Sequence, residues 1–130
     1  MKDALLEFGS LGSLTATSAE FPIEIDFGKI DERRKFQRHN NADGEMNYLC
    51  VRFDKNVASN VTVTIQSKKT TTDSYVTQGT HLLQTPKGNV EHRIPMPAEF
   101  DRYVKVQISA VAADTAKPTA WIQRGAAVAV

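Results

Sequence analysis

The sequence predicts an all-β protein built from antiparallel sheets. Three segments alternate strictly between apolar and polar residues: 23–27, 61–65 and 104–108. Successive side chains of a strand point to opposite faces of a sheet, so each segment indicates a half-buried strand. Turn-rich stretches separate the segments, and no pair of helical patterns is present that would cover a parallel sheet. Two sheets packed face to face, or a barrel, account for this pattern.

The other strands follow in order along the chain. We expect the first over 20–27, ending at Gly28, and the next over 46–53, with Leu49, Val51 and Phe53 on one face. Further strands are expected over the segments 61–66, 75–77, 80–85, 90–94, 101–111 and 119–124. Seven to eight short strands are typical of a β-sandwich with a jelly-roll-like arrangement. The alternation predicts that the shared core of two facing sheets is formed by Val61, Val63, Ile65, Val104, Val106 and Ile108.

The first residues differ from the rest of the chain. Apolar side chains there are separated by glycine, serine and threonine, a pattern typical of an extended arm that becomes ordered by lying on something else. We therefore divide the chain into an extended N-terminal arm, 1–19, and a single β-sandwich domain, 20–130. The arm either covers the protein's own sheet edge and core, or docks on a neighbouring subunit. Under the second interpretation its contact residues are Leu5, Leu6, Phe8, Leu11 and Leu14.

Composition excludes several classes of protein. The 130 residues carry 16 basic and 15 acidic side chains, a net charge of +1, so strong attraction to nucleic acid or to an anionic membrane is not expected. Only one cysteine is present, so no disulfide forms within the chain. The N-terminus does not have the pattern of a secretory signal, and no apolar stretch is long enough to span a bilayer. We expect a soluble protein made in a reducing cytoplasm.

The sequence contains no recognisable catalytic or cofactor-binding motif. His39, His81 and His92 have no second histidine or cysteine at the spacing of metal ligands. Cys50 lies inside an alternating strand, where free cysteine commonly acts as a small buried hydrophobic residue. Phosphate-binding glycine loops and nucleophile elbows are missing too. We therefore expect a binding or structural protein that is not an enzyme, with no cofactor, no metal and no small-molecule substrate.

One cluster of basic residues stands out between 29 and 45. It comprises Arg33, Arg34, Lys35 and Arg38, and Asp31, Glu32, Asp43 and Glu45 lie around it. The cluster is either part of a solvated loop or a contact with an acidic partner surface, because arginine binds carboxylates with two hydrogen bonds. The neighbouring acids and the shortage of aromatic residues argue against nucleic acid.

Several segments, taken in order, resemble a known family. They are Leu14-Thr15-Ala16-Thr17-Ser18, Ile23-Glu24-Ile25-Asp26-Phe27-Gly28, Tyr48-Leu49-Cys50-Val51-Arg52-Phe53, 61–67, Ile94-Pro95-Met96-Pro97, 102–106 and Ala120-Trp121-Ile122. This order and spacing, over about 14–124, is similar to that of the cement, or capsid-stabilising decoration, proteins of tailed bacteriophages. The basic insertion at 29–45 departs from the short turn expected there, so no family contact residues are carried over to it.

The resemblance implies a jelly-roll-like sandwich on the exterior of the virion capsid, made in the cytoplasm of the bacterial host. There it would bind the major capsid protein and cement neighbouring subunits. The alternative is a carbohydrate- or receptor-binding sandwich of a phage tail or another surface; a small hydrolase on a jelly-roll or cupin-like scaffold is a third. From the apolar arm and the sheet edges we also expect self-association, as a dimer or alternatively as a trimer.

Overall fold

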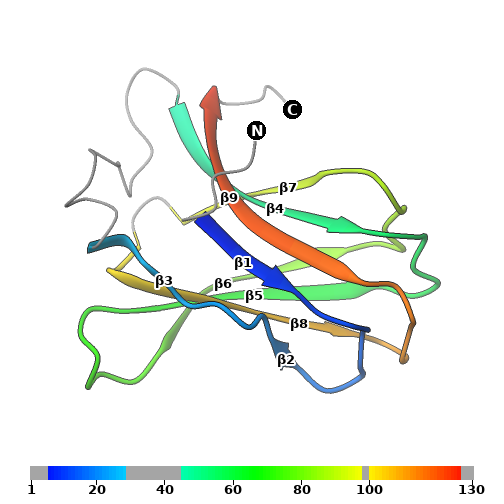
Figure 1. The fold of residues 1–130 in the computed structure, drawn as a ribbon, viewed down its shortest axis with the longest axis horizontal. Coiled ribbons are helices and arrows are strands. Elements are labelled where there is room, and N and C mark those ends of the chain that lie inside the picture. Colours follow the sequence, from blue (N-terminus) through cyan, green and yellow to red (C-terminus); the bar gives the residue numbers. More distant parts are fainter. Residues whose placement is uncertain (1–5, 29–44, 98–99, 127–130) are drawn as a thin grey trace.

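The structure, a computed structural model, describes residues 6–28, 45–97 and 100–126. Within these residues it contains nine β-strands (Figure 1). They are β1 (Glu7–Ser10), β2 (Ala19–Glu20), β3 (Ile25–Asp26), β4 (Glu45–Phe53), β5 (Val61–Lys68), β6 (Val76–Leu83), β7 (His92–Pro95), β8 (Tyr103–Ala110) and β9 (Pro118–Ala126). The predicted all-β class is confirmed.

The strands form two antiparallel sheets that pack against each other as a sandwich (Figure 1). One sheet has the order β1-β9-β4-β7, and the other has the order β2-β8-β5-β6. The short strand β3 also pairs with β8, so β2 and β3 occupy the same edge one after the other. Most connections cross from one sheet to the other, which gives the jelly-roll arrangement that the sequence predicts.

The predicted core residues lie where the alternation places them. Val61, Val63, Ile65, Val104, Val106 and Ile108 are each no more than 1% exposed. They come from β5 and β8, which are neighbours in one sheet, with Val63 opposite Ile108 and Ile65 opposite Val106. Leu49, Val51 and Phe53 of β4 line the other sheet and belong to the same apolar cluster.

The described part of the N-terminal segment is built into the sandwich. β1 is the edge strand beside β9, and Leu14 forms a β-bridge with Asp114. The side chains of Leu6, Phe8 and Leu14 are buried in the core cluster. The described residues 6–19 therefore lie on the sandwich of their own chain, which is the first of the two interpretations given for the arm. The boundary at residue 19 and the contacts with another subunit stay predictions.

Main-chain contacts also close one lateral side of the sandwich. The amide of Ile23, in the connection between β2 and β3, donates a hydrogen bond to the carbonyl of Phe8 in β1 over 3.0 Å. This approach needs glycine at position 9, where φ is +95° and a Cβ atom would lie 2.8 Å from Cγ of Pro22. The two sheets are thus joined at β1 and the β2–β3 connection, whereas β6 and β7 are the terminal strands at the opposite ends of the two sheet orders.

An ion pair attaches β3 to the start of β8. Arg102 donates from Nε to Oδ1 of Asp26 over 2.7 Å and from Nη2 to Oδ2 over 3.1 Å. The amide of Gly28 donates to the same Asp26 Oδ1 over 2.9 Å. A Cβ atom at position 28 would overlap the Arg102 guanidinium group, so glycine there makes room for the ion pair.

Candidate functional surfaces

The lone thiol lies in a second, smaller cluster on the opposite face of β4 from the main core. Cys50 packs there with Tyr48 and Trp121, and it is 0% exposed. Burial raises the pKa of the Cys50 thiol to about 12, and the negative charge of Glu91 acts in the same direction. A nucleophilic cysteine needs a low pKa and access to a substrate, so this position favours the packing role that the sequence indicated.

The described histidines make structural contacts or lie on a sheet edge. A ring nitrogen of His92 is 3.0 Å from the carbonyl oxygen of Lys87, and the ring packs edge to face against Phe53. His81 belongs to β6, while His39 lies outside the described residues. In the part of the chain that the structure describes, no three histidine, cysteine, aspartate or glutamate side chains are grouped to hold a metal ion.

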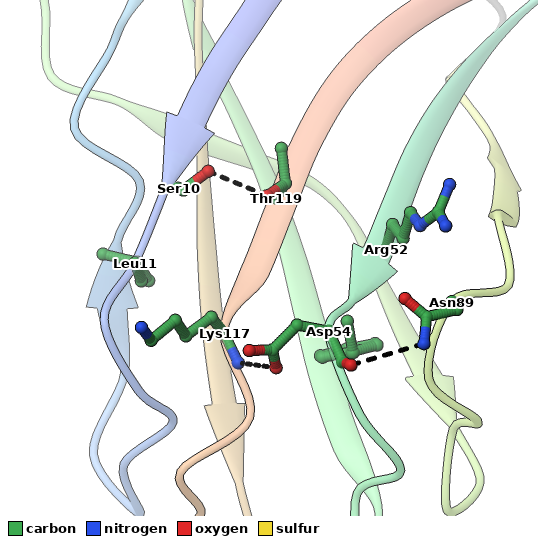
Figure 2. A pocket seen from close by; sticks show the side chains of 8 residues that line it. Ser10, Leu11, Arg52, Asp54, Asn89, Lys117 and Thr119 are labelled. Carbon is green, nitrogen blue, oxygen red and sulfur yellow. Dashed lines mark hydrogen bonds between the residues drawn. The ribbon is translucent and has the colours of Figure 1, made fainter.

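A shallow groove of about 310 Å³ lies beside the ends of β1 and β4 and the start of β9 (Figure 2). It is lined by Ser10, Leu11, Arg52, Phe53, Asp54, Asn89, Lys117 and Thr119. Leu11, one of the predicted contact residues, is only partly buried and packs against the core. At this groove, the apolar side chain of Leu11 is therefore partly accessible to solvent.

Several polar groups of this groove are hydrogen-bonded to one another. Asp54 accepts the amide of Lys117 over 2.7 Å, and its own carbonyl accepts Nδ2 of Asn89 over 3.4 Å. The hydroxyls of Ser10 and Thr119 are 2.8 Å apart. Figure 2 shows Arg52 and Lys117 pointing away from each other on either side of Asp54, so their charges do not converge on one point. This arrangement joins the loops at one end of the sandwich.

The remaining predicted contact residues lie outside the described residues. These are Leu5, Arg33, Arg34, Lys35 and Arg38. The structure thus brings Leu6, Phe8 and Leu14 together in the core, places Leu11 at the groove, and leaves the basic cluster as a prediction.

Sequence reasoning missed a further surface, the edge strand β6. Five of its eight residues are exposed, among them Val76 and Leu82. The signal in the sequence is the lack of charge, because no lysine, arginine, aspartate or glutamate occurs from Ser74 to Pro86. That signal could not be interpreted before the topology showed that this strand lies at an edge.

Comparison with known proteins finds neither a family model nor a curated protein that matches this chain. Across the described residues, no helix has the length and apolar character needed to cross a membrane.

Proposed function

We propose that this protein is a structural component of a tailed-phage virion, which binds the outside of the assembled capsid and cements neighbouring major capsid proteins. The observation that carries the proposal is the ordered resemblance to cement proteins over about 14–124. The jelly-roll sandwich agrees with the fold that the resemblance implies. The buried thiol of Cys50 and the paired groups of the groove are consistent with binding rather than chemistry.

Such a role requires only that the protein binds the assembled shell more tightly than the free capsid subunits. A protein that binds the assembled shell but not free subunits adds its binding free energy to the stability of the assembled state by linkage. Many copies bound to one shell, each bridging neighbouring subunits, make modest individual contacts effective together. A compact domain that presents rigid sheets and their edges is suited to this task.

Leu6, Phe8 and Leu14 are buried within one copy of the chain, which supports a shell-facing surface elsewhere. We assign part of it to the basic cluster Arg33, Arg34, Lys35 and Arg38, which would face carboxylates of the capsid. Contacts of this kind between exposed charges weaken as salt rises.

The test is binding of the purified protein to undecorated mature capsids over a range of ionic strength. We expect saturable binding that weakens with salt. Changing the four basic residues to glutamine should flatten that dependence. A control that neutralises four lysines exposed in the described part of the chain, Lys55, Lys69, Lys87 and Lys117, should retain it. Equal salt dependence in both variants would place the shell contact elsewhere. Binding to another part of the virion, and none to the shell, would overturn the proposal.

The carbohydrate-binding alternative gains no support from the described residues. Sugar sites commonly stack an exposed aromatic ring on the ligand, but the exposed large apolar side chains in the described part are aliphatic: Ile23, Val76, Leu82, Val90 and Val111. Trp121 is 3% exposed, and Phe53 at the groove is fully buried. A saturable hit on a glycan array would favour this alternative.

A further inference from the structure

Three connections between strands meet at one end of the sandwich, on the right in Figure 1: 54–60, 84–91 and 111–117. We call this part of the molecule the loop end. The amide of Gly88 donates a hydrogen bond to Oδ1 of Asn56 over 2.9 Å. A Cβ atom on Gly88 would lie 2.4 Å from Cα of Lys55, so two of these connections are in direct backbone contact.

The connection 84–91 holds two residues in the left-handed region of the backbone. The angle φ is +35° at Thr85 and +59° at Asn89. Left-handed backbone is costly for a β-branched residue, and such strain is common at binding sites. Hydrogen bonds fix both positions, because the Thr85 amide donates to Oδ1 of Asn60 over 3.1 Å and the Asn89 amide donates to the carbonyl of Phe53 over 2.7 Å. The loop end is therefore pre-organised, so little conformational entropy is lost when a partner binds it.

The loop end carries positive charges that have no counter-charge. Four basic side chains are exposed at or beside it: Arg52, Lys55, Lys87 and Lys117. No ion pair of the described residues includes any of these four side chains. The carboxylates of Asp54 and Asp114 accept hydrogen bonds from loop amides. Like charges that gather in this way repel one another, and an acidic partner relieves that repulsion.

Aliphatic side chains are exposed at the same end. Val90 is 47% exposed, and Val111, whose amide donates to the carbonyl of Asn60 over 3.1 Å, is 75% exposed. Leu11 is partly accessible at the neighbouring groove. The large apolar side chains exposed among the described residues are all aliphatic, so this surface offers no aromatic ring on which nucleic-acid bases could stack. Charge together with aliphatic area favours a protein as the partner.

We propose that the loop end binds an extended segment of another protein, one that carries carboxylates and aliphatic side chains. Its carboxylates pair with the four basic side chains, and its aliphatic side chains cover Leu11, Val90 and Val111. In Figure 2, Arg52 and Lys117 point to opposite sides of Asp54, so the positive charges are spread over the surface and match a chain of carboxylates better than one small anion. This inference goes beyond the capsid role, because the shell contact is assigned to different residues.

The test titrates the full chain into a short labelled peptide rich in glutamate and leucine, and measures fluorescence anisotropy. The same peptide with glutamine in place of glutamate is the control probe. We expect saturable binding of the acidic peptide that weakens as salt rises, because the contacts join exposed charges. The glutamine peptide should bind about tenfold more weakly or less tightly still, since several charge pairs are lost together.

Charge reversal at the loop end should weaken this binding. Lys55→Glu and Lys87→Glu should each raise the dissociation constant about threefold or more, and together about tenfold or more. Lys69→Glu is the matched control, because it makes the same change of charge at an exposed lysine just beyond the opposite end of β5. This variant should bind like the parent. Equal midpoints of urea unfolding in the parent and the variants show that the fold is unchanged.

Nuclear magnetic resonance on the parent provides a readout that does not depend on any variant. Amide signals of 54–60 and 84–91 should shift as the acidic peptide is added, while those of 69–74 should not. A parent that does not bind the peptide, or shifts confined to 69–74, would overturn the proposal. Equal affinity for a single-stranded oligonucleotide would overturn it too, because the surface would then bind polyanions without selecting a protein. No capsid takes part in these measurements, so their outcome is separate from that of the proposed function.

Discussion

Replacing Phe8 with alanine tests whether the N-terminal segment is part of the folded domain. The Phe8 ring is 0% exposed and lies in the main core cluster beneath the β1 edge. Phe-to-Ala changes at such positions cost about 3–5 kcal/mol, because transfer free energy is lost and a cavity remains. For a domain with a typical stability of about 5–15 kcal/mol, this raises the unfolded fraction by roughly 10²- to 10⁴-fold.

The assay is urea unfolding followed by the fluorescence of Trp121, the single tryptophan. With an m-value of about 1–3 kcal/mol/M, a loss of about 3–5 kcal/mol should lower the midpoint by about 1–5 M. Val111→Ala is the control, because this side chain is 75% exposed and its loss should change stability by less than about 0.5 kcal/mol. A loss below about 1 kcal/mol for Phe8→Ala would mean that the ring is not in the core, and would restore the docking-arm interpretation.

Three further predictions follow from particular contacts. Cys50 should react with a thiol reagent only when the protein unfolds. Because burial raises its pKa to about 12, the free energy of unfolding should fall as pH rises above about 8.5, the pKa of the unfolded thiol. This fall should be smaller in Cys50→Ala. Gly28→Ala should lower the free energy of unfolding in urea by about 1 kcal/mol, because the added Cβ atom displaces Arg102 from Asp26. The loss in the double variant with Asp26→Asn should be smaller than the sum of the two single losses. Fully additive losses would refute a shared cause. Hydrogen bonds from the amides of Ala116 and Ala58 lower the pKa of Asp114. The parent should therefore melt at a higher temperature than Asp114→Asn above about pH 4, and this difference should disappear at lower pH. A difference in melting temperature that does not depend on pH would contradict this.

Much of the fold follows from local pattern. Strict alternation identifies β5 and β8 and assigns their inward faces correctly, because one buried face fixes which side each residue takes. The N-terminal segment was harder, since glycine and serine between apolar residues look the same in a flexible arm and in an irregular edge strand. What decides its position is non-local, namely the pairing of β1 with β9 and the close approach of Gly9 to Pro22.

The candidate site was less predictable than the fold. The apolar side chains of Leu6 and Phe8 gave no indication whether their partner was the same chain or another one. For β6, the sequence did not show that the strand lies at an edge. A neutral strand is ordinary in the middle of a sheet, and its lack of charge matters only at an edge. Binding surfaces of this kind depend on topology, which the sequence specifies through long-range pairing.

In the proposed function, binding of this protein stabilises the assembled shell. The most direct measurement is the temperature at which purified capsids disassemble, recorded at increasing concentrations of this protein, with the Phe8→Ala variant as a destabilised control. The disassembly temperature should rise with the logarithm of free protein concentration once binding sites begin to fill, as linkage requires. A disassembly temperature that stays constant across the concentration series, with or without bound protein, would contradict the claim.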